Sequence, residues 1–276
     1  MSIYKHQTFK LGEQLTDEQK SFFDEYGFIH FKNFISSDYI ELFVQEIESI
    51  NNKLIAQEVL RINGIPLRYG IDENGKPLIH RLVFASLYSE ILSDFLKNPK
   101  LAALLPLLGK YTGRISEKEK DGLVVNHFEN TTTSTFKQMG WHTDSPRDLF
   151  LGKKIRPMLN VGLHLDDCPF ENGGLRVLPG THKQGIFSLL FKKRYFFDNS
   201  SDPNEIGFDI EAGDLTVHNG KIWHRVQESP HKGEKSRRRV MYIPIITGEY
   251  DPKSEDSATP FYHKIASLSA AKVFRK

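Results

Sequence analysis

The segment MGWHTDSPRD, residues 139–148, holds a histidine and an aspartate two positions apart. In an extended strand, residues i and i+2 point to the same face, so the side chains of His142 and Asp144 can reach one common point. The pair is either two thirds of a metal site or an ordinary polar strand end. Only a third ligand from elsewhere in the chain can decide between these interpretations.

Two later histidines, His218 and His224, lie in the stretch GDLTVHNGKIWHRVQ. Asn219-Gly220 favours a two-residue turn, so His218 should end one strand and His224 should lie on the next. Two histidines and a carboxylate on one face of a metal leave open positions, which is the arrangement of non-haem iron(II) oxygenases. His224 follows Asp144 by 80 residues and several turn signals, which suits a third ligand from a distant strand.

Other histidines compete for this role: His127, His164, His182, His231 and His263. For any single histidine, a hydrogen-bonded core or surface position is the more common outcome.

An oxygenase with an anionic co-substrate also needs a cation to hold it, and SRRRVMY offers Arg237, Arg238 and Arg239. Arg238 follows His224 by 14 residues. A guanidinium group binds a carboxylate through two parallel hydrogen bonds and never loses its charge. The alternative is a solvated basic edge that discourages strand–strand aggregation, and composition alone favours that alternative.

The elements that must position these residues form two parts. In LTDEQKSFFDEYGF, in YIELFVQEIESINNKLIAQ and over about residues 86–108, apolar residues recur at helical spacing, while FIHFKNF alternates like a short strand. From Gly122 onward, short apolar runs are separated by Gly, Pro, Asn and Asp at fairly even intervals, which predicts an antiparallel barrel or jelly roll.

We therefore expect a mainly β fold with flanking α-helices in a single domain, residues 1–276. A helical N-terminal part covers about residues 1–120 and supports a β-sandwich core of about residues 121–248. A polar tail with a final helix covers residues 249–276.

Composition narrows the class of protein. The chain has 276 residues, of which 39% are hydrophobic and 26% charged, as in ordinary globular proteins. Its net charge of +2 gives no reason to expect nucleic acid or an anionic membrane as a partner. The first residues lack a signal-peptide core, and LAALLPLLG is too short to span a bilayer. Cys168 is the only cysteine, so no internal disulfide forms, and we expect a cytoplasmic, reduced protein.

Four stretches, in the order WHTD, LHLDDCPFENGGLRVLPGTHKQG, GDLTVHNGKIWH and RRRV, resemble the phytanoyl-CoA dioxygenase family. Its members are iron(II)- and 2-oxoglutarate-dependent oxygenases with a double-stranded β-helix (jelly-roll) core. The stretch from LTDEQK to QEIESI also resembles the family's opening strand and helices. The likeness spans most of residues 15–245; HxD alone is a weak signal, while ENGGLRVLPGTH is far more specific.

The resemblance implies a ligand set of His142, Asp144 and His224 for Fe(II), with O2 and 2-oxoglutarate as co-substrates. Arg238 best matches the family arginine that holds 2-oxoglutarate, and Arg239 is the fallback because three consecutive arginines leave the register open.

Other polar residues have less specific matches. Asn126 and Asn130 share an expected strand face with Phe128 and resemble positions that contact 2-oxoglutarate or substrate, although each is equally a satisfied core amide. His218 should be structural or support the ligands, and His182 should hold its own loop.

Two residues flank the metal pair. Both are candidates to line the mouth of the site. The alternatives are a core position for Trp141, which is the more common outcome, and a surface position for Arg147.

The resemblance further implies hydroxylation of an unactivated C–H bond in a small molecule, with release of succinate and CO2. Halogenating relatives carry a small residue in place of Asp144, so this carboxylate favours hydroxylation, while desaturation or ring chemistry stays open. The alternatives are a non-catalytic jelly-roll protein that binds a metal or small ligand, and a zinc hydrolase with the same three ligands.

The sequence shows no pronounced basic patch for the phosphates of a CoA thioester, and it does not reveal the oligomeric state. Three loops should select the substrate: residues 68–81, 145–157 and 187–207. The last of these is either a lid or a long surface insertion.

Overall fold

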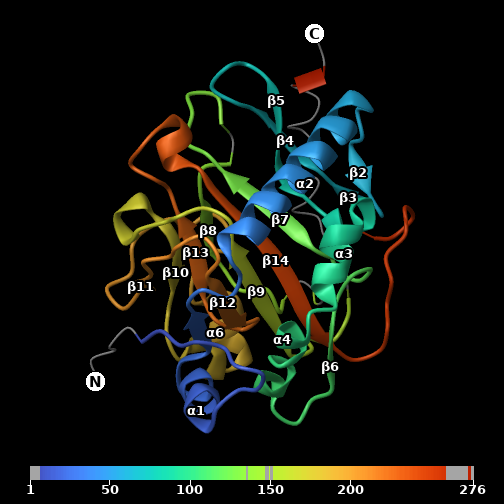
Figure 1. Cartoon of the computed structure of the whole chain (residues 1–276). Helices are drawn as coiled ribbons and strands as arrows, with labels where there is room; N and C mark the ends of the chain where they lie inside the picture. Colours follow the sequence, from blue (N-terminus) through green and yellow to red (C-terminus); the bar gives the residue numbers. More distant parts are fainter. Residues whose placement is uncertain (1–6, 135, 147–148, 150–151, 259–272, 275–276) are drawn as a thin grey trace.

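The computed structural model describes residues 7–134, 136–146, 149, 152–258 and 273–274. Two antiparallel sheets face each other, and helices lie across the outer face of the larger sheet (Figure 1). The α-helices are α1 Asp17–Tyr26, α2 Ser37–Ala56, α3 Glu90–Leu96, α4 Pro99–Ala102 and α6 Ile186–Phe191. Among the described residues, no helix is long and apolar enough to cross a membrane.

The larger sheet has the strand order β1-β12-β9-β14-β7-β5-β4, with β6 also paired to β14. Its strands are β1 Phe28–Phe31, β4 Arg68–Ile71, β5 Pro77–Leu82, β6 Gly113–Ile115, β7 Val124–Phe128, β9 Met158–His164, β12 Leu215–Asn219 and β14 Arg238–Thr247. The smaller sheet has the order β11-β10-β13-β8. Its strands are β8 Met139–His142, β10 Gly174–Val177, β11 Ile206–Gly207 and β13 His224–Gln227. The predicted mainly β fold with flanking helices and a jelly-roll core is confirmed.

The two faces of the larger sheet differ in chemistry because side chains alternate along each strand. On β9, Leu159, Val161 and Leu163 are fully buried and belong to the apolar core beneath the helices. Asn160 and His164 lie on the other face, toward the smaller sheet, where polar groups gather. The sheet thus provides one apolar face for folding and one polar face for the site.

Helix α2 covers the apolar face with one stripe of buried residues: Ile40, Phe43, Ile47, Ile50 and Leu54. Helix α1 begins with a capping box between Thr16 and Gln19 and ends at Gly27, which has a φ of 80°. A Cβ on Gly27 would lie 2.3 Å from the imidazole of His182, whose Nε2 donates to Asp24 O at 3.0 Å. His182 therefore fixes its own loop against α1, in agreement with the prediction for it.

The helical description of residues 1–120 was incomplete, because this part also supplies β1 to β6, including the short hairpin of β2 Arg61–Ile62 and β3 Ile65–Pro66. Residues 68–81, predicted as a loop, form the β4–β5 hairpin. The Asp72 carboxylate accepts two backbone N–H bonds within the turn, and Gly75 takes a φ of 80°. The turn signal was present in the sequence, but the flanking strands are too short to reveal their alternation.

The predicted helical region of about residues 86–108 is a series of short helical turns. The proline ring cannot continue a helix, and Pro99 and Pro106 each lie within the first two residues of a new turn. The final helix predicted in the tail lies mostly outside the described residues.

One buried ionic cluster ties the N-terminal part to the jelly roll. The carboxylate of Asp214, fully buried just before β12, accepts bonds from His30 Nε2 at 2.9 Å, Lys32 Nζ at 2.8 Å, and the backbone N–H groups of Asn33 and Glu211. Burial alone would raise the pKa of Asp214, but these donors outweigh burial and hold that pKa below its usual range. The carboxylate is therefore ionised.

We expect Asp214→Ala to lower the free energy of unfolding by about 3 kcal/mol, because it removes the buried counterion of Lys32 and the hydrogen-bond partner of His30 Nε2. Chemical denaturation of both proteins would measure the difference, with Asp24→Ala, whose side chain is 88% exposed, as the control. Because the pKa of Asp214 is lower in the folded than in the unfolded protein, its ionised carboxylate stabilises the fold above the unfolded pKa of about 4, and this stabilisation is lost as the pH falls. The difference in the free energy of unfolding between the two proteins should therefore shrink below about pH 4. A difference as small as the control's would contradict the role of this cluster.

Candidate metal centre

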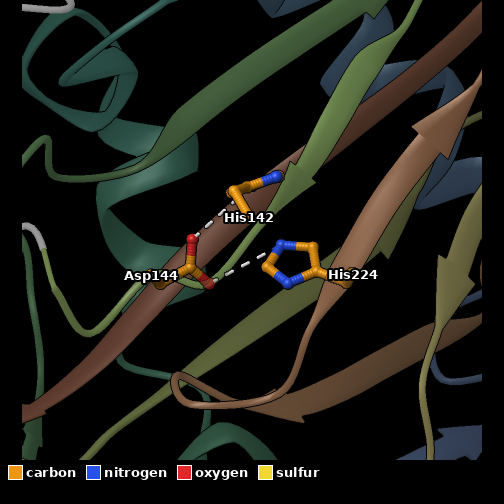
Figure 2. Close-up of side chains that lie close together, drawn as sticks. All are labelled: His142, Asp144 and His224. Carbon is orange, nitrogen blue, oxygen red and sulfur yellow. Dashed lines mark ion pairs between the residues drawn. The ribbon is translucent and has the colours of Figure 1, made fainter. Parts of the chain in front are cut away.

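Strands β8 and β13 bring the three predicted metal ligands together at one end of the barrel. β8 ends at His142 and β13 begins at His224, and these two residues are direct cross-strand partners. Asp144 follows β8 by two residues, and its backbone N–H donates to Gly220 O at 2.9 Å. Figure 2 shows the three side chains pointing toward one another. Their ligand atoms all lie within 4.8 Å of one another.

Both histidines have the same orientation. His142 Nδ1 lies 2.8 Å from Gly140 O, and His224 Nδ1 lies 3.1 Å from Ile222 O. A carbonyl oxygen only accepts, so each Nδ1 carries the proton, and each Nε2 presents a lone pair. The two Nε2 atoms lie 3.9 Å from the Asp144 carboxylate oxygens, which are the contacts drawn in Figure 2.

The charge states also suit a metal. Burial lowers the pKa of His142, and burial together with the imidazoles of His142 and His218 lowers the pKa of His224 well below its usual value. Burial alone would raise the pKa of Asp144, but the neighbouring imidazoles outweigh it and hold that pKa far below the ordinary range. Two neutral imidazoles and one ionised carboxylate are the forms that bind divalent cations.

Two further residues orient the Asp144 carboxylate. His218 Nε2 lies 3.1 Å from Asp144 Oδ2, and Asn160 Nδ2 donates to the same oxygen at 3.2 Å. Both come from the larger sheet, on β12 and β9, and they leave Oδ1 on the side of His142. His218 therefore supports the ligand carboxylate, which agrees with its predicted secondary role.

This donor set fits a divalent transition metal. When a metal ion is bound at about 2.1 Å from each nitrogen or oxygen ligand, the ligand atoms lie roughly 3–4 Å from one another. Small rotations of these three side chains bring their ligand atoms to such distances. All three donors lie at one end of the barrel, so the far side of an ion would stay open, as in the two-histidine, one-carboxylate site of iron oxygenases.

Arg238 lies at the opposite end of the barrel, where β14 begins and β7 ends. It is 3% exposed, and its guanidinium donates to three backbone carbonyls, those of Gln227, Lys137 and Ser236. A guanidinium has five N–H donors, and these three carbonyls use one on Nε and one on each terminal nitrogen. One N–H therefore remains on each terminal nitrogen, and a carboxylate can accept two such hydrogen bonds in parallel. The thiol of Cys168 also lies within hydrogen-bonding reach of the guanidinium.

A small cavity of about 20 Å³ adjoins Arg238, enough for about one water molecule. Asn126 shares this face of β7, directly opposite Val240, and its buried Oδ1 has no hydrogen-bond partner among the described residues. An unsatisfied buried amide oxygen between Arg238 and the metal end suits contact with a ligand.

Two predicted contacts do not fit this geometry. Arg239 points to the other side of β14, where its guanidinium makes parallel bonds to Asp166 at 2.7 and 2.9 Å, so its fork is already used. Asn130 lies beyond the end of β7, and its amide nitrogen donates to Ser229 O at 2.9 Å. Strand alternation ends at Phe128, which is why Asn130 holds a loop instead of facing the barrel interior.

The segment of residues 195–200 lies along the free edge of β8. Phe196 N donates to Trp141 O at 2.9 Å, and Trp141 N donates to Asp198 O at 2.8 Å. A Cβ on Gly140 would lie 2.5 Å from Phe196 O, so this close approach needs glycine. The ring of Phe196 stacks on His142 at 4.9 Å between centroids. Part of residues 187–207, the segment expected to be either a lid or a long surface insertion, therefore packs against His142, a predicted metal ligand.

Trp141 and Arg147 flank the predicted metal ligands in the sequence. Trp141 is fully buried with Leu178 and Trp223, as expected for a core residue. Arg147 lies outside the described residues.

Asn160 and Phe196 were not singled out from the sequence. Asn160 had a usable signal: it is a lone amide in the apolar run PMLNVGLHL, on the same strand face as His164. Phe196 had none, because only the pairing of its segment with β8 brings the ring to His142.

The family model described as phytanoyl-CoA dioxygenase (PhyH) matches residues 23–239. A search of curated proteins found no match. Among solved structures, the non-heme alpha ketoglutarate dependent epimerase SnoN from nogalamycin biosynthesis has 15% identity and a TM-score of 0.60, covering 89% of this chain and 92% of that one. HygX from Streptomyces hygroscopicus, solved with nickel and 2-oxoglutarate bound, has 19% identity and a TM-score of 0.61, covering 86% and 89%.

The carbocyclase SnoK, also from nogalamycin biosynthesis, has 14% identity and a TM-score of 0.60, covering 92% of this chain and 98% of that one. At these identities the three structures show a shared fold. The family match, by contrast, covers most of the sequence. The chain therefore belongs to the phytanoyl-CoA dioxygenase family of iron(II)- and 2-oxoglutarate-dependent enzymes.

Proposed function

We propose that this protein is an oxygenase that hydroxylates an unactivated C–H bond of a small molecule and converts 2-oxoglutarate to succinate and CO2. The observation that carries the proposal is the pairing of two sites within one barrel. His142, Asp144 and His224 offer two neutral nitrogens and one ionised oxygen at one end. Arg238 has N–H donors at the other end beyond those that its three backbone carbonyl partners use.

In this proposal His142, Asp144 and His224 hold Fe(II), and the bound metal supplies the activation of O2. The chain's own residues do the positioning. The carbonyls of Gly140 and Ile222 fix the imidazole rings, and His218 with Asn160 fixes the carboxylate.

In the same proposal, Arg238 binds the distal carboxylate of 2-oxoglutarate. Asn126 Oδ1 accepts a hydrogen bond from a group bound between Arg238 and the metal end of the barrel. Phe196 covers one face of His142 and keeps water from that side of the site.

Asp144 supports hydroxylation over halogenation, because a ligand carboxylate takes the position that a halide needs. The names of SnoN and SnoK describe an epimerase and a carbocyclase, so the shared fold accommodates other outcomes. We also propose that residues 1–276 form a single catalytic domain, since one apolar core links the N-terminal helices to both sheets. The single cysteine supports a reducing, cytoplasmic location.

Isotope labelling tests the reaction. Candidate small molecules are incubated with the Fe(II)-loaded enzyme, 2-oxoglutarate and ¹⁸O2, and succinate and product are analysed by mass spectrometry. Hydroxylation places one labelled oxygen in succinate and one in the product. A product that lost two hydrogens without gaining oxygen would replace hydroxylation by desaturation. Product formation without O2 and 2-oxoglutarate would favour a zinc hydrolase, and ligand binding without any turnover would favour a non-catalytic binder.

A further inference from the structure

The metal end of the barrel has a rim made by other strands. β9 begins at Met158 and its antiparallel neighbour β14 ends at Thr247, so these two residues lie at the same end of the larger sheet. Met158 O accepts from Gly220 N, and Gly220 O accepts from Asp144 N, which places that end beside the three predicted ligands. Arg238, the first residue of β14, lies at the far end. Whatever lies beside Met158 and Thr247 therefore flanks the metal on the side away from Arg238.

A pocket of about 400 Å³ opens at this rim. Most of its lining is charged or aromatic, and it comes from three separate segments of the chain. The lining includes Lys120, Lys153, Lys154, Arg156, Tyr250 and Lys253. This volume is within the range of about 300–1,000 Å³ that small-molecule sites occupy.

Positive charge exceeds negative charge in the pocket. Five basic side chains line it against three carboxylates, those of Glu119, Glu249 and Asp251. Glu119 is already neutralised, because the guanidinium of Arg114 binds both its oxygens at 2.6 and 2.5 Å. Asp251 faces two lysines, Lys153 at 2.6 Å and Lys253 at 3.5 Å. Lys154 and Arg156 have no carboxylate partner among the described residues, and these two cations favour an anion with more than one charge.

The guanidinium of Arg156 lies against the backbone at Gly248. A Cβ on Gly248 would lie 1.6 Å from Arg156 Nη1, so the guanidinium packs on the bare glycine at the edge of the pocket. Arg156 and Lys154 are exposed. The planar fork of an arginine beside lysine ammonium groups is a common arrangement for binding phosphate.

Short contacts connect the pocket to the metal centre. Lys120 Nζ lies 3.4 Å from Met158 Sδ. Met158 O accepts Gly220 N at 2.8 Å, and Gly220 O accepts Asp144 N at 2.9 Å. A chain of contacts through Met158 and the turn at Gly220 therefore links Lys120, in the lining of the pocket, to Asp144.

From these observations we infer that the rim pocket binds the phosphate group of a small-molecule substrate, which places the rest of that molecule over the metal. The substrate role rests on the proposed function, while the anion site stands on the pocket's own charges. The exposed ring of Tyr250, beside the guanidinium of Arg114 at 5.7 Å, offers a flat surface for an organic group next to the phosphate. The sequence shows no pronounced basic patch for the phosphates of a CoA thioester, and this pocket gathers its cations from three separate segments of the chain.

Calorimetric titration of the full-length protein with phenyl phosphate tests the site. We expect saturable binding that is weakened about tenfold or more by Arg156→Ala and by Lys154→Ala, since each removes a charge-assisted hydrogen bond. Arg61→Ala and Lys100→Ala replace exposed cations outside the pocket and should leave the affinity unchanged. Benzoate, with the same ring and a single charge, should bind more weakly. No saturable binding, or equal affinity in Arg156→Ala, would overturn the inference.

Binding should persist in Asp144→Ala, which separates the anion site from the metal centre. Matched pairs of phosphorylated and dephosphorylated compounds, screened for succinate formation, then test the substrate role. We expect turnover with the phosphorylated member and a KM about tenfold higher in Arg156→Ala, with kcat retained. Turnover of an unphosphorylated compound with an unchanged KM would refute the substrate role.

Two outcomes separate the remaining possibilities. Phenyl phosphate binding without succinate formation from any pair would refute the proposed function and leave the anion site in place. Cosedimentation with phosphatidic acid vesicles that Arg156→Ala abolishes, without binding of phenyl phosphate, would assign the pocket to a lipid headgroup instead.

Discussion

Replacing Asp144 by alanine is expected to reduce substrate-triggered succinate formation to background. The substitution removes the one anionic ligand among the three and leaves His218 and Asn160 without their acceptor. A metal supplies several kcal/mol of transition-state stabilisation, so its loss corresponds to about a thousandfold or more in rate. His142→Ala should have a similar effect through loss of a nitrogen ligand. Succinate measured after addition of Fe(II), 2-oxoglutarate and substrate provides the readout.

Asp94→Ala is the matched control, since this side chain is 72% exposed and belongs to α3. It should retain full turnover. Thermal unfolding must show that Asp144→Ala and His142→Ala are folded, and equilibrium dialysis should show weaker Fe(II) binding by both. Unchanged turnover in a folded Asp144→Ala protein would refute the assignment of the metal centre.

Arg238→Leu is expected to raise the KM for 2-oxoglutarate about a hundredfold and to leave Fe(II) affinity nearly unchanged. Removing one partner of a buried, hydrogen-bonded charge pair costs about 2–5 kcal/mol, which covers this factor. Arg238→Lys should recover part of the loss, because an ammonium keeps the charge but cannot make two parallel bonds to a carboxylate. Succinate formation at varied 2-oxoglutarate concentrations gives the KM for each variant.

The adjacent arginine provides a sharp control. Arg239→Leu breaks the ion pair with Asp166 on the other face of β14, so it should lower the free energy of unfolding and leave the KM for 2-oxoglutarate unchanged. The opposite pattern, with Arg239→Leu raising the KM and Arg238→Leu neutral, would reverse the assignment of the two residues.

The pairing of His142 with Asp144 and the barrel could be predicted because their signals are local, whereas His224 was added by its resemblance to the family pattern. Two residues at i and i+2 on a strand share a face whatever surrounds them, and the evenly spaced apolar runs after Gly122 required short antiparallel strands. The choice between Arg238 and Arg239 was not local. It depends on which face of β14 turns toward the barrel, and a shift of one residue reverses every side chain.

Other features could not be predicted because they exist only after strands pair. The rim pocket combines Lys120, residues 153–156 and residues 249–253, which are far apart in the sequence and meet through the pairing of β14 with β6 and β9. A net charge of +2 for the whole chain conceals this local surplus. The contact of Phe196 with His142 likewise depends on a loop lying along the edge of β8.

The attachment of residues 195–200 to β8 has a consequence for how such enzymes diverge. The two bonds between Trp141 and this segment use only main-chain atoms, and the close approach requires only that residue 140 lack a side chain. Mutation can therefore exchange the side chains of this segment while its path beside His142 is inherited unchanged. A lineage could in this way acquire a new wall over the reaction centre, and with it a new substrate, without altering any residue that holds the metal.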